Sequence, residues 1–408
     1  MTPHLNSKIA RLHGLRNRVL KTPAAISRVV PALVLIAGGL LAGCQADGDS
    51  LSNSVKNTDI KAPSSTVEES FGETGTEITL LLPKGSTGLY EGEARDIRDG
   101  AALGVGEVGN GQVFVKVVDV SGGLASVAAA VSAAKARNSA LLVSFAPQAT
   151  TAAVAAIPSA ERLPLINLGA PVPATSGNVY NFTSDEVDSA VEGARTSVSS
   201  GHKKVFVFAT TELTAIGEAR IADGVRASGG TYLGSARYAL SDASAADAVT
   251  KSKVQMQGAD TIVVLGKSTI VTTVAGAIKA AGFTNITLVG TSGWPQQAYT
   301  SPAVSGALIA MVDPEGASMI SERYQRHYRR PLTANAAYGY DAVAIASGII
   351  RTKDPKALTA ENLTSKTGFR GITGLFRLNV SGGVERKLSL FTITGGKPNL
   401  FVAAPKAF

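Results

Sequence analysis

From residue 77 onward, apolar runs of strand length alternate with longer stretches in which apolar residues recur at helical spacing. Ile78–Leu82, Val113–Asp119 and Leu141–Ser144 are such runs, and Tyr90–Gly106 and Gly123–Ala136 are the Ala- and Gly-rich stretches between them. Continuous apolar strands bounded by turns are typical of a parallel sheet with both faces covered. The repeated strand–helix units therefore predict a doubly wound α/β domain with right-handed crossovers.

The alternation stops at Tyr180–Thr183 and then restarts, which predicts a second unit of the same kind. The strands expected there are Lys204–Ala209, Thr231–Tyr238, Thr261–Leu265, Ile286–Gly290 and Ala307–Val312. Near the C-terminus, Gly374–Val380 and Leu388–Thr394 are expected to pair as a β-hairpin through Ser381–Gly383. A chain of this length exceeds the size at which a single core keeps growing, so two domains are expected.

The N-terminal residues carry the pattern of a secretory leader. Val29–Leu41 is a short apolar run that follows six basic side chains and no acidic one. Such a run before small residues is typical of a signal peptide, and it is shorter than the about 20 residues that span a bilayer. Leu41-Ala42-Gly43-Cys44 resembles the lipobox of bacterial lipoproteins, in which the chain is cut before a lipidated Cys. The alternative is a simple signal peptide with an accidental Cys, but Cys44 is the only Cys in the chain. We therefore predict a signal peptide at 1–43 and a lipid anchor on Cys44.

Removal of this leader changes the charge of the chain. The formal charge falls from +8 to +2, because 39 Lys and Arg become 33 while the 31 Asp and Glu all remain. The mature charge argues neither for nucleic acid nor for a polybasic membrane patch. Gln45–Thr76 is rich in Ser, Asn, Asp, Thr and Gly without an apolar period, so residues 44–76 are expected to be a disordered tether.

The sequence around each motif that suggests a catalytic or cofactor site argues against that site. Gly104–Gly109 matches G-x-G-x-x-G but follows a predicted helix, whereas a dinucleotide site needs it after a strand. Gly266–Thr269 resembles the end of a P-loop, yet Thr261 occupies the position of its first Gly. The four His residues form no visible metal or Ser-His-Asp set. We therefore expect no cofactor, no metal and no enzymatic activity.

The loops that follow the predicted strands are the candidate site, because ligands of open α/β sheets bind beyond the carboxyl ends of the strands. These loops are Pro83–Tyr90, Ser144–Gln148, Leu168–Pro173, Thr210–Ile216, Gly266–Ile270 and Thr291–Gln296. Their Gly, Ser and Thr residues expose backbone N–H groups and hydroxyls that can hold a carboxylate. The plainer alternative for any one loop is that small residues simply make turns.

From about Glu77 to Lys397 the chain resembles the type I periplasmic binding proteins, in particular the branched-chain amino-acid receptors. The resemblance rests on the order of Leu81–Tyr90, Tyr338–Val343 and the Gly371–Leu375 start of a terminal hairpin. It implies two doubly wound parallel-sheet lobes joined by three crossovers that close on a small ligand. Lobe I would comprise residues 77–182 and 316–369, and lobe II residues 183–315 and 370–408.

The resemblance carries the family's ligand contacts over unevenly. Its first-lobe contacts fall on Tyr90, Ser144, Phe145, Ala146, Gly169 and Ala170, and the second-lobe loops offer Thr211, Ser268, Ser292 and Trp294. In amino-acid receptors, an acid after the second-lobe Gly holds the ligand ammonium, but no acid follows Gly290 here. Ile216 also replaces the expected aromatic. An ordinary α-amino acid is therefore disfavoured, because an ammonium without a countercharge is costly to desolvate. Asp341 is expected to serve hinge or helix packing.

Two functions follow from the resemblance. The first is a lipid-anchored periplasmic receptor that captures a small polar solute in the interlobe cleft for an ABC permease. The alternative is a lipoprotein similar to the penicillin-binding protein activators of the same fold, which contact a cell-wall synthase. The residue after Cys44 is Gln45 and not Asp, which in lipoproteins that resemble the enterobacterial kind favours outer-membrane sorting and with it the activator role. Because the sorting rule for this chain is open, the anchor is expected in the inner or the outer membrane.

Overall fold

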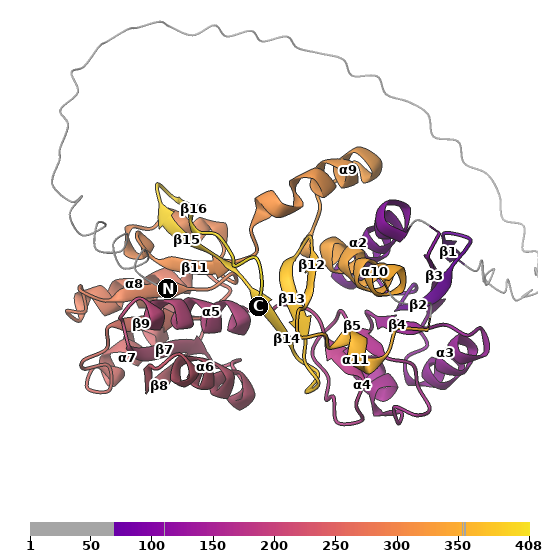
Figure 1. Cartoon of the computed structure of the whole chain (residues 1–408). Coiled ribbons are helices and arrows are strands. Elements are labelled where there is room, and N and C mark those ends of the chain that lie inside the picture. The colour runs from indigo at the N-terminus through magenta and orange to yellow at the C-terminus, as the bar shows by residue number, and fades with distance from the viewer. Residues whose placement is uncertain (1–68, 110, 353, 355) are drawn as a thin grey trace, which may run out of the picture. The chain divides into compact units, whose positions relative to one another are not determined.

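The computed structural model describes residues 69–109, 111–352, 354 and 356–408 (Figure 1). The predicted signal peptide, Cys44 and most of the predicted tether lie outside these residues. The described part contains two large sheets and one small one. Its helices include none long and apolar enough to cross a membrane.

The first lobe is built on a six-stranded sheet of order β1-β3-β2-β4-β5-β6. The strands are β1 (Glu69–Phe71), β2 (Thr76–Leu82), β3 (Val113–Asp119), β4 (Leu141–Ser144), β5 (Leu165–Asn167) and β6 (Val179–Asn181). β2 to β6 are parallel. Three helices follow β2, β3 and β4 in turn: α2 (Leu89–Gly104), α3 (Leu124–Ala136) and α4 (Gln148–Ala156). The π-helical turn η1 (Val105–Gly109) extends α2. Apolar side chains cover both faces of the sheet in separate buried clusters, as the continuous apolar strands predicted.

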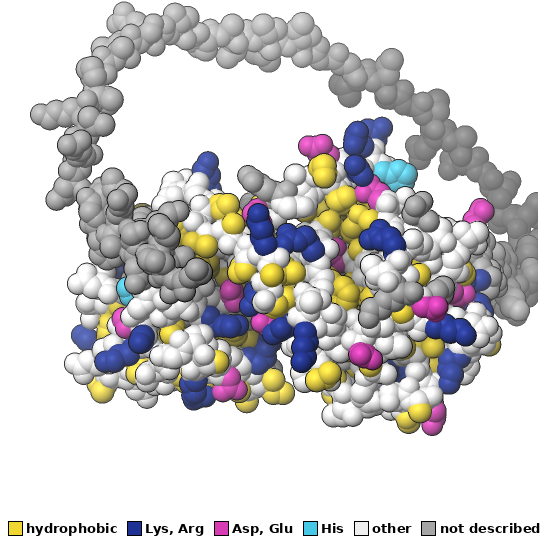
Figure 2. Space-filling view, viewed as in Figure 1, with side chains coloured by type: hydrophobic (Ala, Val, Ile, Leu, Met, Phe, Trp, Pro, Cys, Tyr) yellow, Lys and Arg dark blue, Asp and Glu magenta, His cyan; other side chains and the backbone are white. Residues whose placement is uncertain are grey.

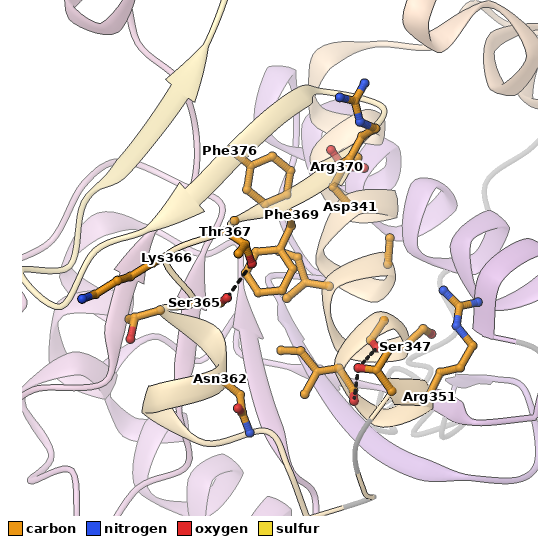
Figure 3. A pocket seen from close by; sticks show the side chains of 18 of the residues that line it. Asp341, Ser347, Arg351, Asn362, Ser365, Lys366, Thr367, Phe369, Arg370 and Phe376 are labelled. Carbon is orange, nitrogen blue, oxygen red and sulfur yellow. Dashed lines mark hydrogen bonds between the residues drawn. The ribbon is translucent and has the colours of Figure 1, made fainter. Parts of the chain in front are cut away.

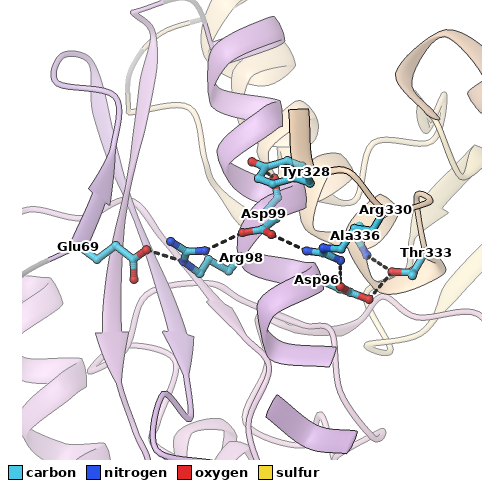
Figure 4. A network of polar contacts seen from close by, with 8 residues as sticks. All are labelled: Glu69, Asp96, Arg98, Asp99, Tyr328, Arg330, Thr333 and Ala336. Carbon is cyan, nitrogen blue, oxygen red and sulfur yellow. Dashed lines mark hydrogen bonds and ion pairs between the residues drawn. The ribbon is translucent and has the colours of Figure 1, made fainter. Parts of the chain in front are cut away.

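The prediction of a tether up to residue 76 is wrong for its last residues. β1 pairs antiparallel with β3, and Phe71 packs against the first-lobe core. Glu69 forms ion pairs with Lys84, at 3.0 Å, and with Arg98 of α2. Figure 4 shows how Arg98 continues this network through Asp99. A strand of three residues is too short to show an alternating pattern, so only its partners reveal it.

The second lobe is built on a seven-stranded sheet of order β16-β15-β11-β10-β9-β7-β8. Its strands are β7 (Lys204–Thr210), β8 (Thr231–Tyr238), β9 (Thr261–Val264), β10 (Thr287–Gly290), β11 (Leu308–Met311), β15 (Ser389–Thr394) and β16 (Lys397–Val402). β7 to β11 are parallel, and β15 and β16 add antiparallel strands at one edge. The helices of this lobe are α5 (Glu186–Ser199), α6 (Ala215–Ala227), α7 (Asp242–Ser252) and α8 (Ile270–Ala280), with the 3-10 turns η2 (Gln296–Thr300) and η3 (Pro302–Val304).

After β11 the chain returns to the first lobe. This segment contains η4 (Pro314–Ala317), α9 (Ser318–Tyr328), α10 (Ala334–Thr352), α11 (Ala360–Leu363), β12 (Phe369–Gly371), β13 (Gly374–Leu378) and β14 (Val384–Lys387). α10 packs against α2 at two glycines. A methyl group at Gly100 would come within 1.9 Å of the Ala336 carbonyl oxygen, and one at Gly339 within 2.2 Å of that of Ile97. Only glycine allows the two helix backbones to approach this closely.

The predicted C-terminal hairpin is wrong in its second arm. β13 pairs with β14, whereas β15 pairs with β11 and β16 of the second-lobe sheet. The turn was predicted correctly, but the apolar pattern could not show which later strand is the partner. Phe376 and Leu378 of β13 belong to the first-lobe core, while Leu388 and Leu390 pack with Ala310. We therefore propose to place the third crossover near Leu388 instead of residue 370. The other predicted domain boundaries stay predictions.

Candidate functional site

At the first-lobe edge, the loops after β4 and β5 lie against each other. Leu168 donates a backbone hydrogen bond of 2.8 Å to the Ser144 carbonyl, and a methyl group at Gly169 would lie 3.4 Å from the Ala146 carbonyl oxygen. Tyr90, at the start of α2, stacks on Phe145 with ring centroids 4.9 Å apart and an interplanar angle of 22°. The structure thus brings together five residues that the sequence pointed to, from three separate loops.

Among the described residues, these loops contain two backbone N–H groups without an acceptor, one on the buried Ala146 and one on the exposed Ala170. The neighbouring groups are paired, because Gly169 N–H donates to Asn167 Oδ1 at 2.9 Å and Asn167 Nδ2 donates to the Ala170 carbonyl at 2.8 Å. The Asn167 side chain therefore fixes the loop and leaves the Ala170 N–H available. Two such donors on adjacent loops suit a carboxylate.

Ser144, in contrast, has a partner inside the lobe. Its side chain is fully buried, and its Oγ lies 3.0 Å from Thr151 Oγ1 of α4. The hydroxyl therefore holds the start of α4 against the end of β4. A contact between Ser144 and a ligand stays a prediction.

At the second-lobe edge, a carboxylate that the sequence reasoning missed joins two loops. Glu186 Oε2 accepts hydrogen bonds from Gly266 N–H at 2.9 Å and from Thr291 Oγ1 at 3.4 Å. These partners follow β9 and β10. Burial raises the pKa of Glu186, although the charge of Lys267 and the hydrogen bond from Gly266 act in the opposite direction. Among the residues described here, no basic side chain forms an ion pair with Glu186.

Local structure explains why Glu186 lies there. α5 leads into β7 of the second sheet, and its first turn lies at the carboxyl edge of that sheet, beside the loops after β9 and β10. Asp185 caps α5 by accepting from Asp188 N–H at 3.0 Å, while the Asp188 side chain accepts from Asp185 N–H at 3.2 Å. Glu186 is the first residue of this helix. An acid in a first turn is also the ordinary complement of the helix dipole, so the sequence alone did not mark it as a site residue.

The second-lobe candidates are placed differently from one another. Thr211 and Ser292 are exposed, and Ser268 is partly buried, all in loops at the carboxyl ends of the strands. Trp294 is only 3% exposed, and its indole N–H donates to the Val264 carbonyl at 2.8 Å. Its ring is part of the second-lobe core. Ile216, in the first turn of α6, is 76% exposed. The ligand contacts of these residues stay predictions.

Asp341 does not belong to the loops at the ends of the two large sheets and packs, as expected, within the fold. It is fully buried on α10 and accepts hydrogen bonds from Ile372 N–H at 2.8 Å and from Thr373 N–H at 2.9 Å. Thr373 Oγ1 also donates to it at 2.5 Å and accepts from Arg386 at 2.7 Å. Asp341 therefore fixes the turn between β12 and β13 to α10.

A separate cavity of about 870 Å³ lies beside α10, α11 and β12. Figure 3 shows Ser365 bonded to Thr367, at 2.9 Å, on one side and Arg351 on the other. This cavity does not include the strand-end loops.

On the face in Figure 2, Lys and Arg side chains are interspersed with Asp and Glu, so no large patch of one sign covers that face. Within the described residues, no three His, Cys, Asp or Glu side chains are grouped as metal ligands.

The chain forms two lobes, each built on a largely parallel sheet, and crosses between them three times. Loops of small residues lie at the carboxyl ends of both sheets. This arrangement is the type I periplasmic binding protein fold. A family model described as periplasmic binding protein matches residues 77–397. The chain belongs to this family, and the predicted fold class is confirmed.

Solved structures of similar fold include several transport proteins. A putative branched-chain amino-acid ABC transporter protein from Rhodospirillum rubrum is 17% identical with a TM-score of 0.67, covering 80% of this chain and 100% of its own. A solute-binding protein from R. palustris, solved with benzoate, is 18% identical with a TM-score of 0.52, covering 82% and 97%. A branched-chain amino-acid binding protein from Streptococcus pneumoniae, solved with isoleucine, is 19% identical with a TM-score of 0.51, covering 81% and 100%. A search of curated proteins found no significant match.

Proposed function

We propose that this protein is a periplasmic solute-binding receptor that holds a small carboxylate between the strand-end loops of its two lobes and delivers it to an ABC importer. The observation that carries this proposal is the pair of unpaired N–H groups at Ala146 and Ala170, beside the stacked rings of Tyr90 and Phe145. Hydrogen bonds from a neutral backbone to an anion are strong and need no buried cation. The family assignment supports the periplasmic location.

Relatives of the same fold support the ligand class. The R. palustris protein was solved with benzoate and the S. pneumoniae protein with isoleucine, and both ligands carry a carboxylate. They differ in that isoleucine also carries an ammonium.

The test is removal of one donor without removal of bulk. Ala170 precedes Pro171, so its backbone already favours the extended region that proline occupies. Ala170→Pro deletes the N–H and keeps a small side chain. A panel of amino acids and organic acids is screened by thermal shift, and Kd is measured through the fluorescence of Trp294, the only Trp in the chain.

We expect wild type to bind at least one carboxylate, and Ala170→Pro to bind it about 10- to 100-fold more weakly, the worth of a hydrogen bond to a charged group. The variant should keep the wild-type melting temperature without ligand. The proposal fails if no carboxylate raises the melting temperature of the wild type, or if a folded Ala170→Pro variant binds as tightly.

We also propose that Cys44 carries a lipid anchor, as its position after Leu41-Ala42-Gly43 indicates. In a bacterial host, the full chain should incorporate radiolabelled palmitate and sediment with membranes, and Cys44→Ser should do neither. Equal membrane association of the two chains would refute the anchor.

The same purified protein also tests the alternative function, a regulator of cell-wall synthesis. Capture of a purified cell-wall synthase by the soluble Cys44→Ser chain, together with no response to any carboxylate, would favour that role over transport.

A further inference from the structure

We propose that the cavity beside α10, α11 and β12 is a second binding site, which takes a small organic acid with an apolar body. The cavity does not include the strand-end loops, so this site does not depend on the proposed receptor function. Its volume of about 870 Å³ lies within the range of about 300–1,000 Å³ that is typical of small-molecule sites.

A buried hydroxyl without a partner is the first support. Ser347 lines the cavity from α10 and is 1% exposed, and its Oγ has no hydrogen-bond partner among the described residues. A hydroxyl inside a helix commonly bonds a carbonyl of the preceding turn, as Thr352 does on the same helix with the Gly348 carbonyl at 2.9 Å. An unpaired buried hydroxyl is unfavourable, and an acid group in the cavity would supply the missing acceptor.

An unpaired cation one helical turn away is the second support. Arg351 follows Ser347 by four residues, so the two side chains lie on the same face of α10 (Figure 3). The Arg351 guanidinium forms neither an ion pair nor a hydrogen bond with the residues that the structure describes. A guanidinium can donate two parallel hydrogen bonds to one carboxylate. Both side chains can therefore donate to the head group of an acid.

The other charged side chains leave the lining positive. Lys366 and Arg370 are exposed, and Arg370 also donates to a backbone carbonyl at 3.0 Å. The acids are the exposed Glu361 and the buried Asp341, whose oxygens already accept hydrogen bonds from the turn between β12 and β13. With Arg351, three cations therefore line the cavity against two acids. This balance favours an anion over a cation.

Apolar side chains account for the ligand's body. Phe369 of β12 and Phe376 of β13 both line the cavity, with ring centroids 6.1 Å apart. Val380, after β13, also lines it and is 87% exposed. A bare anion would leave these surfaces in water, whereas an aromatic or aliphatic body would cover them. The lining therefore fits a phenylalkanoate or a short fatty acid.

Gly348 keeps the α10 wall of the cavity open. It lies inside the helix, where glycine is less favourable than alanine, and it lines the cavity. The contact with α2 explains Gly339 on the same helix, but a methyl group at Gly348 would meet no heavy atom within 4 Å. Helix packing thus does not require glycine at position 348, whereas a large side chain there would enter the cavity.

The competing interpretation is a water-filled hollow in which Ser347 bonds only to solvent. Three variants separate the two interpretations. Arg351→Gln removes the charge, Ser347→Ala removes the hydroxyl, and Gly348→Phe fills the space. Arg326→Gln is the matched control, because Arg326 is also exposed in the last turn of a helix and unpaired among the described residues, but lies on α9 outside the cavity.

The probes are phenylacetate, 4-phenylbutyrate, hexanoate and octanoate, each paired with the alcohol that replaces its carboxylate. Calorimetry measures the dissociation constants for the wild type, the four variants and Ala170→Pro. We expect at least one acid to bind about 10-fold or more tightly than its alcohol. Arg351→Gln should weaken it about 10- to 100-fold and Ser347→Ala about 10-fold, as expected for hydrogen bonds with a charged partner. Gly348→Phe should abolish binding, whereas Arg326→Gln and Ala170→Pro should leave it unchanged.

The outcomes separate this site from the receptor function. The second site is overturned if no probe acid binds, or if Arg351→Gln leaves every bound acid as tight as in the wild type. Arg351 is exposed, so this variant should fold even if Gly348→Phe does not. An acid that is weakened by Ala170→Pro and not by Arg351→Gln would belong to the strand-end loops, and the receptor function would then stand without the second site.

Ser347→Ala adds a measurement that a purely structural role would not pass. It removes an unpaired hydroxyl and introduces the best helix former, so the ligand-free variant should melt no lower than the wild type while it binds the acid more weakly. A lower melting temperature with unchanged binding would show that the hydroxyl serves the fold and not a ligand.

Discussion

The Arg386 guanidinium donates a hydrogen bond of 2.6 Å to the carbonyl oxygen of Phe182, 204 residues earlier in the chain. Phe182 follows β6, where the chain first leaves the first lobe, and Arg386 belongs to β14, just before the chain leaves it for the last time. The guanidinium also lies 4.6 Å from the Phe182 ring centroid and 5.0 Å from that of Phe376. One buried cation therefore joins two crossovers of the chain.

We expect Arg386→Met to lower the free energy of unfolding by about 3 kcal/mol or more, because it leaves buried carbonyls unpaired and removes cation–π contacts. Arg377→Met on the neighbouring strand is the control. Arg377 is partly exposed and pairs with Glu385 at 2.6 Å, so its loss should cost about 1 kcal/mol or less. Urea unfolding measures both. Equal losses of unfolding free energy in the two variants would mean that the buried contacts of Arg386 contribute no more to stability than an exposed ion pair.

The α2–α10 contact gives a second prediction. Gly339→Ala would place a methyl group within 2.2 Å of the Ile97 carbonyl oxygen, so the helices must separate, at a cost of about 1–3 kcal/mol or more. Gly348→Ala on the same helix has open space and should instead stabilise the protein by about 0.5–1 kcal/mol. Thermal and urea unfolding should therefore give opposite signs for the same substitution, and like signs would contradict the packing.

Glu69 gives a third prediction, which depends on pH. Burial raises the pKa of Glu69, but the hydrogen bonds and charges of Lys84 and Arg98 outweigh it, so the net shift is downward from 4.5. A lowered pKa in the folded state stabilises the protein above pH 4.5, and this stabilisation is lost as the pH falls through the folded value. Glu69→Gln should thus destabilise by about 1 kcal/mol or less at pH 7 and have no effect in acid. The control is Glu73→Gln at an exposed position. If the loss of stability in Glu69→Gln grew toward low pH, the pKa of Glu69 would be raised and not lowered in the folded protein.

Glu186 gives a fourth prediction, in which stability depends on pH in the opposite direction. Its pKa is raised above 4.5, mainly by burial. The folded state then holds the proton more tightly than the unfolded state, so stability falls as the pH rises from 4.5 to the folded value and is constant above it. Glu186→Gln should therefore raise the melting temperature of the ligand-free protein at pH 7 and leave it unchanged near pH 4. A variant less stable than the wild type at pH 7 would show that the charge itself holds the two loops.

Local pattern was enough for much of the fold. The bounds of β3, β4 and β8 match their predictions residue for residue. β3 and β4 are largely apolar runs, whereas β8 is a mixed segment that follows the turn at Gly229 and Gly230. The loops after β4 and β5 lie at the same edge because the two strands are parallel, so Ala146 and Gly169 could be placed together from the sequence alone.

The sequence by itself determined the α/β class, the order of the strands and helices, and the edge at which a ligand would bind, because these depend on periodicity over a few neighbouring residues. Only the tertiary structure decided that β14 and not β15 pairs with β13, that residues 69–71 complete the first sheet, and that Glu186 reaches Thr291 across 105 residues. The physical reason is the same in each case. A hydrogen-bond partner is chosen by where the crossovers bring the backbone, and no local spacing of residues encodes that distance.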